Sequence, residues 1–158
     1  MTLFARLRRF ASAAPPATPF AAGVAALERN RIDEALAHFA RAHAVAASAN
    51  ERAAVANKRG VAHVRRGDRE AAVGAFVDAV LADASFVPAI VNIGNLLLED
   101  DAVDEAVIHY EAALLLDDTY AAGHLNLGVA YKRLGRRGEA VREFRRANRL
   151  EGRLRLFR

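Results

Sequence analysis

The sequence contains no cysteine and no tryptophan, and only 7% of its 158 residues are aromatic. Without cysteine the chain cannot form a disulfide, a thiolate nucleophile or a zinc–thiolate site. No uninterrupted apolar run approaches the roughly 20 residues that span a bilayer. Hydrophobic residues make up 53% of the chain, and many of them are alanine. Alanine, leucine, glutamate and arginine lose little rotamer freedom in a helix, so the composition predicts an all-α fold.

Charge is distributed unevenly along the chain, although the net charge is only +4. Residues 1–10 hold three arginines and no acid, and residues 142–158 hold seven arginines against Glu143 and Glu151. The long segment between these ends is therefore net acidic. A nucleic-acid-binding protein is expected to carry its basic residues along one working face. We therefore expect no nucleic-acid partner.

The N-terminus partly resembles a secretory signal, because arginines precede a stretch of small residues. A signal peptide needs an apolar region of about 7–15 residues between its basic start and its cleavage site. Here only Phe10 and Ala11 separate the arginines from Ser12. We therefore expect a cytoplasmic protein, with the membrane periphery as the alternative.

An internal repeat is the most informative feature of the chain. Glycine recurs at the eighth position of each repeat (Gly23, Gly60, Gly94, Gly128), alanine at the twentieth (Ala35, Ala72, Ala106, Ala140) and an aromatic residue at the twenty-fourth (Phe39, Phe76, Tyr110, Phe144). The steps between repeats are 37, 34 and 34 residues, so a three-residue insertion lies near Ser48–Glu51. This register predicts four repeats (16–49, 53–86, 87–120 and 121–152), preceded by a segment 1–15 and followed by a short basic end, 153–158.

Each repeat is expected to form two helices joined by a short turn. The predicted helices cover 17–29 and 33–46, 51–66 and 69–82, 87–99 and 103–116, and 121–134 and 137–150. Helix-breaking or capping residues occupy the turns: Asn30, Gly67–Asp68, Asp100–Asp101 and Gly135. We expect the glycine and alanine columns where the two helices of a repeat approach most closely, because overpacking there costs about 1–3 kcal/mol. The aromatic column is expected to fill the space toward the next repeat, so that the repeats must stack.

This spacing resembles the tetratricopeptide repeat family, and in particular its small bacterial members, over residues 16 to about 152. The resemblance implies a right-handed α-solenoid whose first helices line a concave groove. The polar groove residues that it implies are Asn57, Lys58, Arg65, Asn92, Asn95, Asn126, Lys132 and Arg133. The apolar groove residues are Phe20, Val24, Leu27, Val61, Leu98, Leu125 and Val129. The first repeat departs most from the family pattern, with Ala22 and Ala26 where larger side chains are usual.

Asparagines in this groove could hold a peptide backbone. Position 6 carries Lys58, Asn92 and Asn126, and an asparagine amide offers both an acceptor and donors to an extended chain; the alternative is that asparagine is simply a soluble choice on an exposed helix. Family members that bind chaperone tails use a clamp for two carboxylates. Its positions correspond here to Asn57, Val61, Asn92, Ala122 and Asn126. Only Asn92 fits, so a chaperone tail is not the expected ligand.

Both ends of the chain are amphipathic. Leu3, Phe4, Leu7 and Phe10 share one helical face beside arginines, which is typical of a segment that docks on a membrane surface or a partner. The alternative is a solvated tail. At the other end we expect a turn at Gly152, after which too few residues remain for a capping helix. If the helix continued, Leu150, Leu154 and Phe157 would form one apolar stripe flanked by arginines. That end either folds back over the last repeat or mediates self-association or contact with a membrane surface.

The sequence shows no catalytic or metal-binding constellation. Two histidines, His38 and His43, are five residues apart and fall on different helix faces, unlike a helical metal pair. The acids around Glu99–Asp101 lack the ligand spacing of a calcium loop and are placed to cap the next helix. We therefore expect no enzyme and no cofactor. The favoured function is a protein-interaction module, either an adaptor or scaffold or a chaperone-like protein, that holds a peptide or helix of a partner protein in the groove. The alternative is a structural assembly protein that self-associates as a homo-oligomer, or docks weakly on a membrane surface, through its arginine-rich ends.

Overall fold

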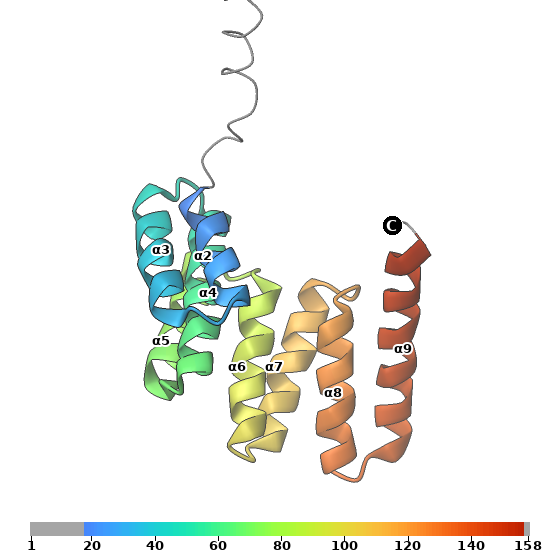
Figure 1. Cartoon of the computed structure of the whole chain (residues 1–158). Helices are drawn as coiled ribbons and strands as arrows, with labels where there is room; N and C mark the ends of the chain where they lie inside the picture. The colour runs from blue at the N-terminus through green and yellow to red at the C-terminus, as the bar shows by residue number, and fades with distance from the viewer. Residues whose placement is uncertain (1–17, 157–158) are drawn as a thin grey trace, which may run out of the picture.

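The computed structural model describes residues 18–156, and in that range the chain forms eight helices. In chain order these are α2 (Pro19–Glu28), α3 (Ile32–Val45), α4 (Ala49–Arg66), α5 (Arg69–Ala82), α6 (Val87–Glu99), α7 (Val103–Leu116), α8 (Ala121–Arg133) and α9 (Arg137–Leu156). They pair as four antiparallel hairpins stacked in a row, with α2 and α9 at opposite ends (Figure 1). The predicted all-α solenoid is confirmed. The amphipathic segment predicted at 1–15 lies outside the described residues.

The turn inside each hairpin contains one residue with left-handed backbone geometry. Its φ is 58° at Asn30, 84° at Gly67, 62° at Asp101 and 73° at Gly135. These four residues occupy the same repeat position, directly after the first helix or one residue beyond it. A left-handed residue ends a helix because it turns the chain away from the helical path. The predicted turns therefore stand at the expected positions.

An aspartate holds each of the second and third links between hairpins. Asp83 Oδ1 accepts hydrogen bonds from the Ser85 N–H at 2.9 Å and from its hydroxyl at 2.7 Å. Asp117 Oδ1 accepts the same pair from Thr119, at 2.9 and 2.6 Å. The hydroxyl bond, then the backbone bond, lower the pKa of both aspartates. Each carboxylate thereby holds the loop that positions the next hairpin.

The first link differs because it contains the insertion. Ser48 Oγ accepts from the Glu51 N–H at 3.0 Å, while Glu51 Oε2 accepts from the N–H groups of Ser48 and Ala47. This reciprocal arrangement is a capping box, and its bonds to the Ala47 and Ser48 backbones lower the pKa of Glu51. As a result α4 has 18 residues, whereas α6 and α8 have 13. The insertion extends α4 at its N-terminus.

The glycine column makes room for the aromatic column of the same hairpin. A Cβ built on Gly23 would lie 2.5 Å from Phe39 Cε1, and the same overlap occurs at Gly60 with Phe76, Gly94 with Tyr110 and Gly128 with Phe144. Each ring therefore lies over the glycine of its own hairpin, a contact that was not predicted from the sequence. The expected contact toward the next repeat is present as well for Phe76, which clusters with Leu96. The alanine column is buried throughout: Ala35, Ala72, Ala106 and Ala140.

The last helix continues past the turn predicted at Gly152, so that prediction was wrong. α9 runs from Arg137 to Leu156. A glycine inside a helix costs only about 1 kcal/mol relative to alanine, and the flanking leucines and arginines favour helix. Leu150 is buried and anchors this part of α9 to the array. Within residues 18–156, no helix combines the length and apolar character needed to cross a membrane.

Candidate groove for a peptide

Facing side chains of α4 and α6 form a small cavity on the side of the array lined by the first helices. It has a volume of about 150 Å³ and is lined by Val61, Val64, Phe76, Asn92, Asn95, Leu96 and Glu99. We call it the groove cavity. Two of the predicted polar groove residues, Asn92 and Asn95, and the predicted apolar residue Val61 therefore come together at one place. The floor is Phe76, the fully buried aromatic residue of the second repeat.

Four asparagines form a continuous chain of hydrogen bonds across the groove. Asn126 Nδ2 donates to Asn95 Oδ1 at 2.7 Å, Asn95 Nδ2 to Asn92 Oδ1 at 3.4 Å, and Asn92 Nδ2 to Asn57 Oδ1 at 2.8 Å. The Tyr110 hydroxyl also donates to Asn95 Oδ1, at 2.8 Å. This asparagine chain links α4, α6 and α8.

These bonds change what the asparagines can offer to a ligand. Asn57 is only 6% exposed, so it lies beneath the groove surface and not on it as predicted. Asn95 Oδ1 already accepts two hydrogen bonds and has no lone pair left. Asn92 and Asn126 are half-buried, and each keeps one amide hydrogen beyond the bond that it donates. Asn126 also keeps its carbonyl oxygen. Only part of the predicted ladder therefore faces outward with free capacity.

Two of the predicted groove cations bind the end of the preceding first helix. Arg65 Nη1 donates to the carbonyl of Leu27 at 2.6 Å, and Arg133 Nη1 donates to the carbonyl of Leu98 at 2.7 Å. Both arginines occupy repeat position 13, and both leucines occupy position 12. The arginines therefore satisfy helix carbonyls that have no partner within the helix. Leu27 and Leu98 are buried, so the prediction that they line an open groove was wrong.

The third repeat has Glu99 at this position, and Glu99 instead accepts a hydrogen bond from Arg69 of the second repeat. Arg69 donates to Glu99 Oε2 at 3.2 Å, to the Leu96 carbonyl at 2.5 Å, and to Asp100. The recurrence of arginine at position 13 could have revealed this role in the sequence. The contact of Arg69 with the Leu96 carbonyl could not be foreseen, because the two residues are 27 positions apart in the sequence.

The two lysines of the predicted groove have no acidic partner within the described residues. Lys58 is half-buried on α4, and Lys132 is exposed near the end of α8. The ion pairs found there involve arginines and histidines instead, for example Arg133 with Asp101 at 3.9 Å. Positive charge on this side of the array is therefore available to a ligand.

The histidines do not converge on a site in the described part of the chain. His124 is 8% exposed; its Nδ1 lies 2.6 Å from Glu143 Oε2 and its Nε2 lies 2.9 Å from the Asp118 carbonyl. It thus holds α8 against α9. His63 lies 3.7 Å from Asp68, beside a turn. Between residues 18 and 152 no group of three or more histidines and acids is arranged to hold a metal ion.

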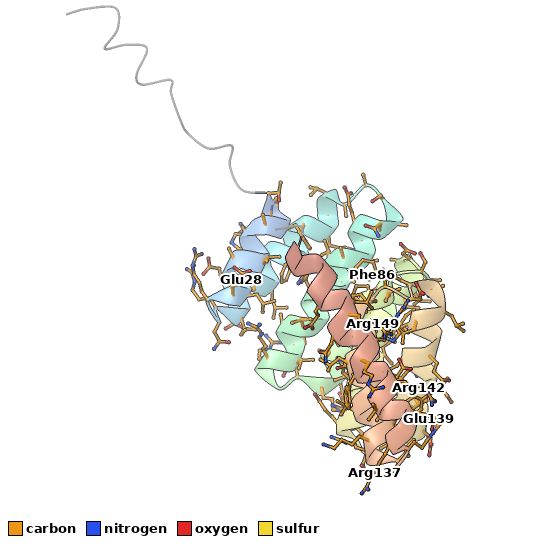
Figure 2. All side chains as sticks on the ribbon, turned by 90° about the vertical axis from the view of Figure 1, so that its right-hand side faces the viewer. Glu28, Phe86, Arg137, Glu139, Arg142 and Arg149 are labelled. Carbon is orange, nitrogen blue, oxygen red and sulfur yellow. The ribbon has the colours of Figure 1, made fainter. Side chains whose placement is uncertain are left out.

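The end of the array at α9 is less covered than its interior. Phe144 is half-buried, whereas the equivalent Phe39, Phe76 and Tyr110 are at most 1% exposed. No further repeat lies on Phe144 in the described chain. Figure 2 shows the array from this end, with Arg137, Arg142 and Arg149 spaced along α9.

Two family models match the C-terminal part of the chain. Residues 92–135 match a model described as TPR repeat, and residues 121–153 match one described as tetratricopeptide repeat. No curated protein matches the sequence.

Solved structures extend the similarity to the whole array. A crystal structure of MamA is 20% identical, covers 85% of this chain and 77% of its own, and superposes with a TM-score of 0.68. YrrB, a TPR protein with an unusual peptide-binding site, is 21% identical, with 85% and 68% covered and a TM-score of 0.63. The second TPR domain of Spaghetti (RPAP3), bound to the HSP90 peptide SRMEEVD, is 26% identical, with 62% and 91% covered and a TM-score of 0.58.

Proposed function

Because this chain belongs to the tetratricopeptide repeat family, whose repeats form protein-interaction modules, we propose that its groove cavity binds an extended, partly apolar peptide segment of a partner protein. The observation that carries this proposal is the combination of apolar walls and free amide groups in one cavity between α4 and α6. Such a protein acts as an adaptor or a chaperone-like holder.

The cavity suits a peptide whose backbone is hydrogen-bonded by the asparagine side chains and which inserts one apolar side chain into the cavity. Asn92, in the cavity lining, retains an amide hydrogen that can donate to a peptide carbonyl. Asn126, which lies outside the lining on α8 and is bonded to Asn95, retains an amide hydrogen and a carbonyl oxygen for the same backbone. Val61, Val64 and Leu96 offer apolar surface to a side chain. Contacts to a backbone give affinity, and the pocket gives specificity, as in other modes of peptide recognition.

The positive charge of two lysines adds a preference for peptides that carry an acidic residue next to the apolar residue. Lys58 and Lys132 stand without an acidic partner in the described chain, and an acidic residue of the ligand would supply one. Two structural neighbours support a peptide ligand in general, since one is described by its peptide-binding site and another was solved with a bound peptide. The poor match to the two-carboxylate clamp argues for a different peptide here.

The test is a peptide selection followed by affinity measurements. A random peptide library is selected on the wild-type protein, and the peptides obtained are synthesised with a fluorescent label. We expect the double variant Asn92→Ala/Asn126→Ala to bind them about 5- to 150-fold more weakly, because two lost hydrogen bonds remove about 1–3 kcal/mol. The matched control is Asn148→Ala, an exposed asparagine on α9. Equal affinities for the wild type and the double variant would show that the asparagine chain does not contribute to peptide binding.

A second candidate function rests on the open end of the array. Phe144 is half-buried at this end. Together with exposed arginines of α9, of which Arg142 and Arg149 are labelled in Figure 2, it supports self-association or contact with an anionic membrane surface. Phe144→Ala would also open the space beside Gly128, so a gentler variant is needed. We expect Arg142→Glu/Arg149→Glu to lower the mass in solution or the binding to anionic liposomes if this end mediates either contact. Unchanged values for both would remove this candidate.

A further inference from the structure

The three junctions between hairpins differ in the residue that precedes the first helix. Phe86 precedes α6 and Tyr120 precedes α8, each as the N-cap residue. Before α4, the N-cap residue is Ser48. The first junction therefore lacks the aromatic side chain that the other two have in common.

At the second junction the aromatic side chain fills a defined space. Phe86 packs against a cluster of buried alanines, Ala53, Ala56, Ala79 and Ala89, together with Val80 and Ala82. Tyr120 plays the corresponding part at the third junction, where it packs against the main core cluster beside Leu114. In both cases an aromatic side chain fills the space between one hairpin and the next.

At the first junction the corresponding space is a cavity of about 360 Å³. We call it the junction cavity. Its lining includes Pro19, Ala42, Val45 and Val55, which in the repeat register correspond to Ala56, Ala79, Ala82 and Ala89, the residues around Phe86. The junction cavity is thus the place that Phe86 and Tyr120 fill elsewhere. It shares no lining residue with the groove cavity.

The insertion explains why nothing from the link itself fills this cavity. The N-cap position is taken by Ser48, whose side chain is engaged in the capping box. Arg52 stands directly before the first position of the second repeat, and its guanidinium donates to the Ala47 carbonyl at 3.2 Å. Neither side chain offers an aromatic ring.

We propose that the junction cavity binds an aromatic side chain and that Phe10, in the chain's own N-terminal segment, supplies it. The described chain begins at Thr18, which lies in the wall of the cavity. Seven residues separate Phe10 from Thr18. They reach about 25 Å when extended, which is enough for the chain to fold back over Thr18. Phe20 is itself part of the cavity wall, and Phe10 is the first aromatic residue that precedes it in the sequence.

Charge at the rim agrees with this occupant. Glu51 lines the cavity, is exposed, and remains a carboxylate in its capping box. Phe10 directly follows Arg8 and Arg9. Their guanidinium groups can therefore approach Glu51 when the ring enters the cavity.

The absence of tryptophan from the chain makes a direct test possible. Phe10→Trp introduces a single fluorescent reporter into the full-length protein, and Phe4→Trp is the matched control. We expect the emission of Phe10→Trp to be shifted to shorter wavelength than in urea, and that of Phe4→Trp to match its unfolded form. Adding Ala54→Tyr, which places a ring in the cavity wall, should return the emission of Phe10→Trp to that of an exposed indole.

Three fluorescence results would overturn the proposal. One is an emission of Phe10→Trp that equals its unfolded value, and another is a shift that Ala54→Tyr leaves unchanged. The third is a shift that grows with protein concentration, because a second copy would then supply the ring. Independently of fluorescence, Phe10→Ala but not Phe4→Ala should speed amide hydrogen exchange at residues 42–46, at the end of α3 beside the cavity. Equal exchange in both variants also counts against the proposal.

Discussion

Replacing Gly60 with alanine tests the contact that recurs in every repeat. A Cβ at this position would lie 2.5 Å from Phe76 Cδ1 and 2.8 Å from Cζ, whereas carbon atoms prefer about 3.5–4.0 Å. Phe76 is 1% exposed, so the ring has little room to retreat. Overpacking of this kind costs about 1–3 kcal/mol, while alanine gains about 1 kcal/mol of helix propensity over glycine. Because the overlap involves three ring atoms, we expect a net loss of roughly 1–2 kcal/mol in the free energy of unfolding.

The same hairpin supplies a matched control. Gly74 lies inside α5, and a Cβ built on it would meet no atom within 4 Å. Gly74→Ala should therefore stabilise the protein by about 0.5–1 kcal/mol. Both free energies are measured by urea unfolding followed by circular dichroism, with unchanged m-values as evidence for a common unfolded state. If Gly60→Ala stabilises as much as Gly74→Ala, the packing account of the glycine column is wrong.

Three further predictions concern turns, caps and ionisation. Asp101→Gly should stabilise the protein by about 0.5–1 kcal/mol in urea unfolding, because glycine adopts the left-handed φ of 62° without strain; a loss would contradict this. Arg133→Met should cost about 1 kcal/mol, because it removes the 2.7 Å bond to the Leu98 carbonyl and leaves only the 3.3 Å bond from the Asp101 N–H, and it should leave affinity for groove peptides nearly unchanged. Burial raises the pKa of Tyr110 and Tyr131 to about 12, against about 10 in an unfolded chain. The free energy of unfolding should therefore be unaffected below about pH 10 and fall between about pH 10 and 12, and phenolate absorbance that rises near pH 10 in the folded protein would refute this.

Most of the fold follows from periodicity and turn chemistry. The glycine, alanine and aromatic columns each recur at a fixed position, and the hairpin turns coincide with Asn30, Gly67, Asp101 and Gly135. These are local signals, so a single sequence carries them. The prediction for the C-terminal end was wrong because Gly152 was expected to end the last helix. The leucines and arginines around Gly152 favour helix, and α9 continues through it.

The groove was less predictable because side-chain partners come from distant repeats. The sequence places the groove asparagines on first helices, but it does not reveal that Asn92 bonds to Asn57 or that Asn126 bonds to Asn95. Likewise Arg65 was expected to face a ligand, and its contact with the Leu27 carbonyl spans 38 residues. Which hydrogen bonds a polar side chain satisfies internally depends on the spacing of neighbouring helices, and that spacing is a tertiary property.

The central claim is that the side lined by the first helices holds the peptide, and one comparison tests it most directly. Val64 lines the groove cavity and is 40% exposed, while Val73 on α5 is 42% exposed and does not line it. Arginine at either position therefore perturbs stability similarly. Affinity for a selected peptide, measured by fluorescence anisotropy, should fall at least about tenfold, or about 1.4 kcal/mol, for Val64→Arg and stay at the wild-type value for Val73→Arg. Equal losses, or a loss confined to Val73→Arg, would contradict the account.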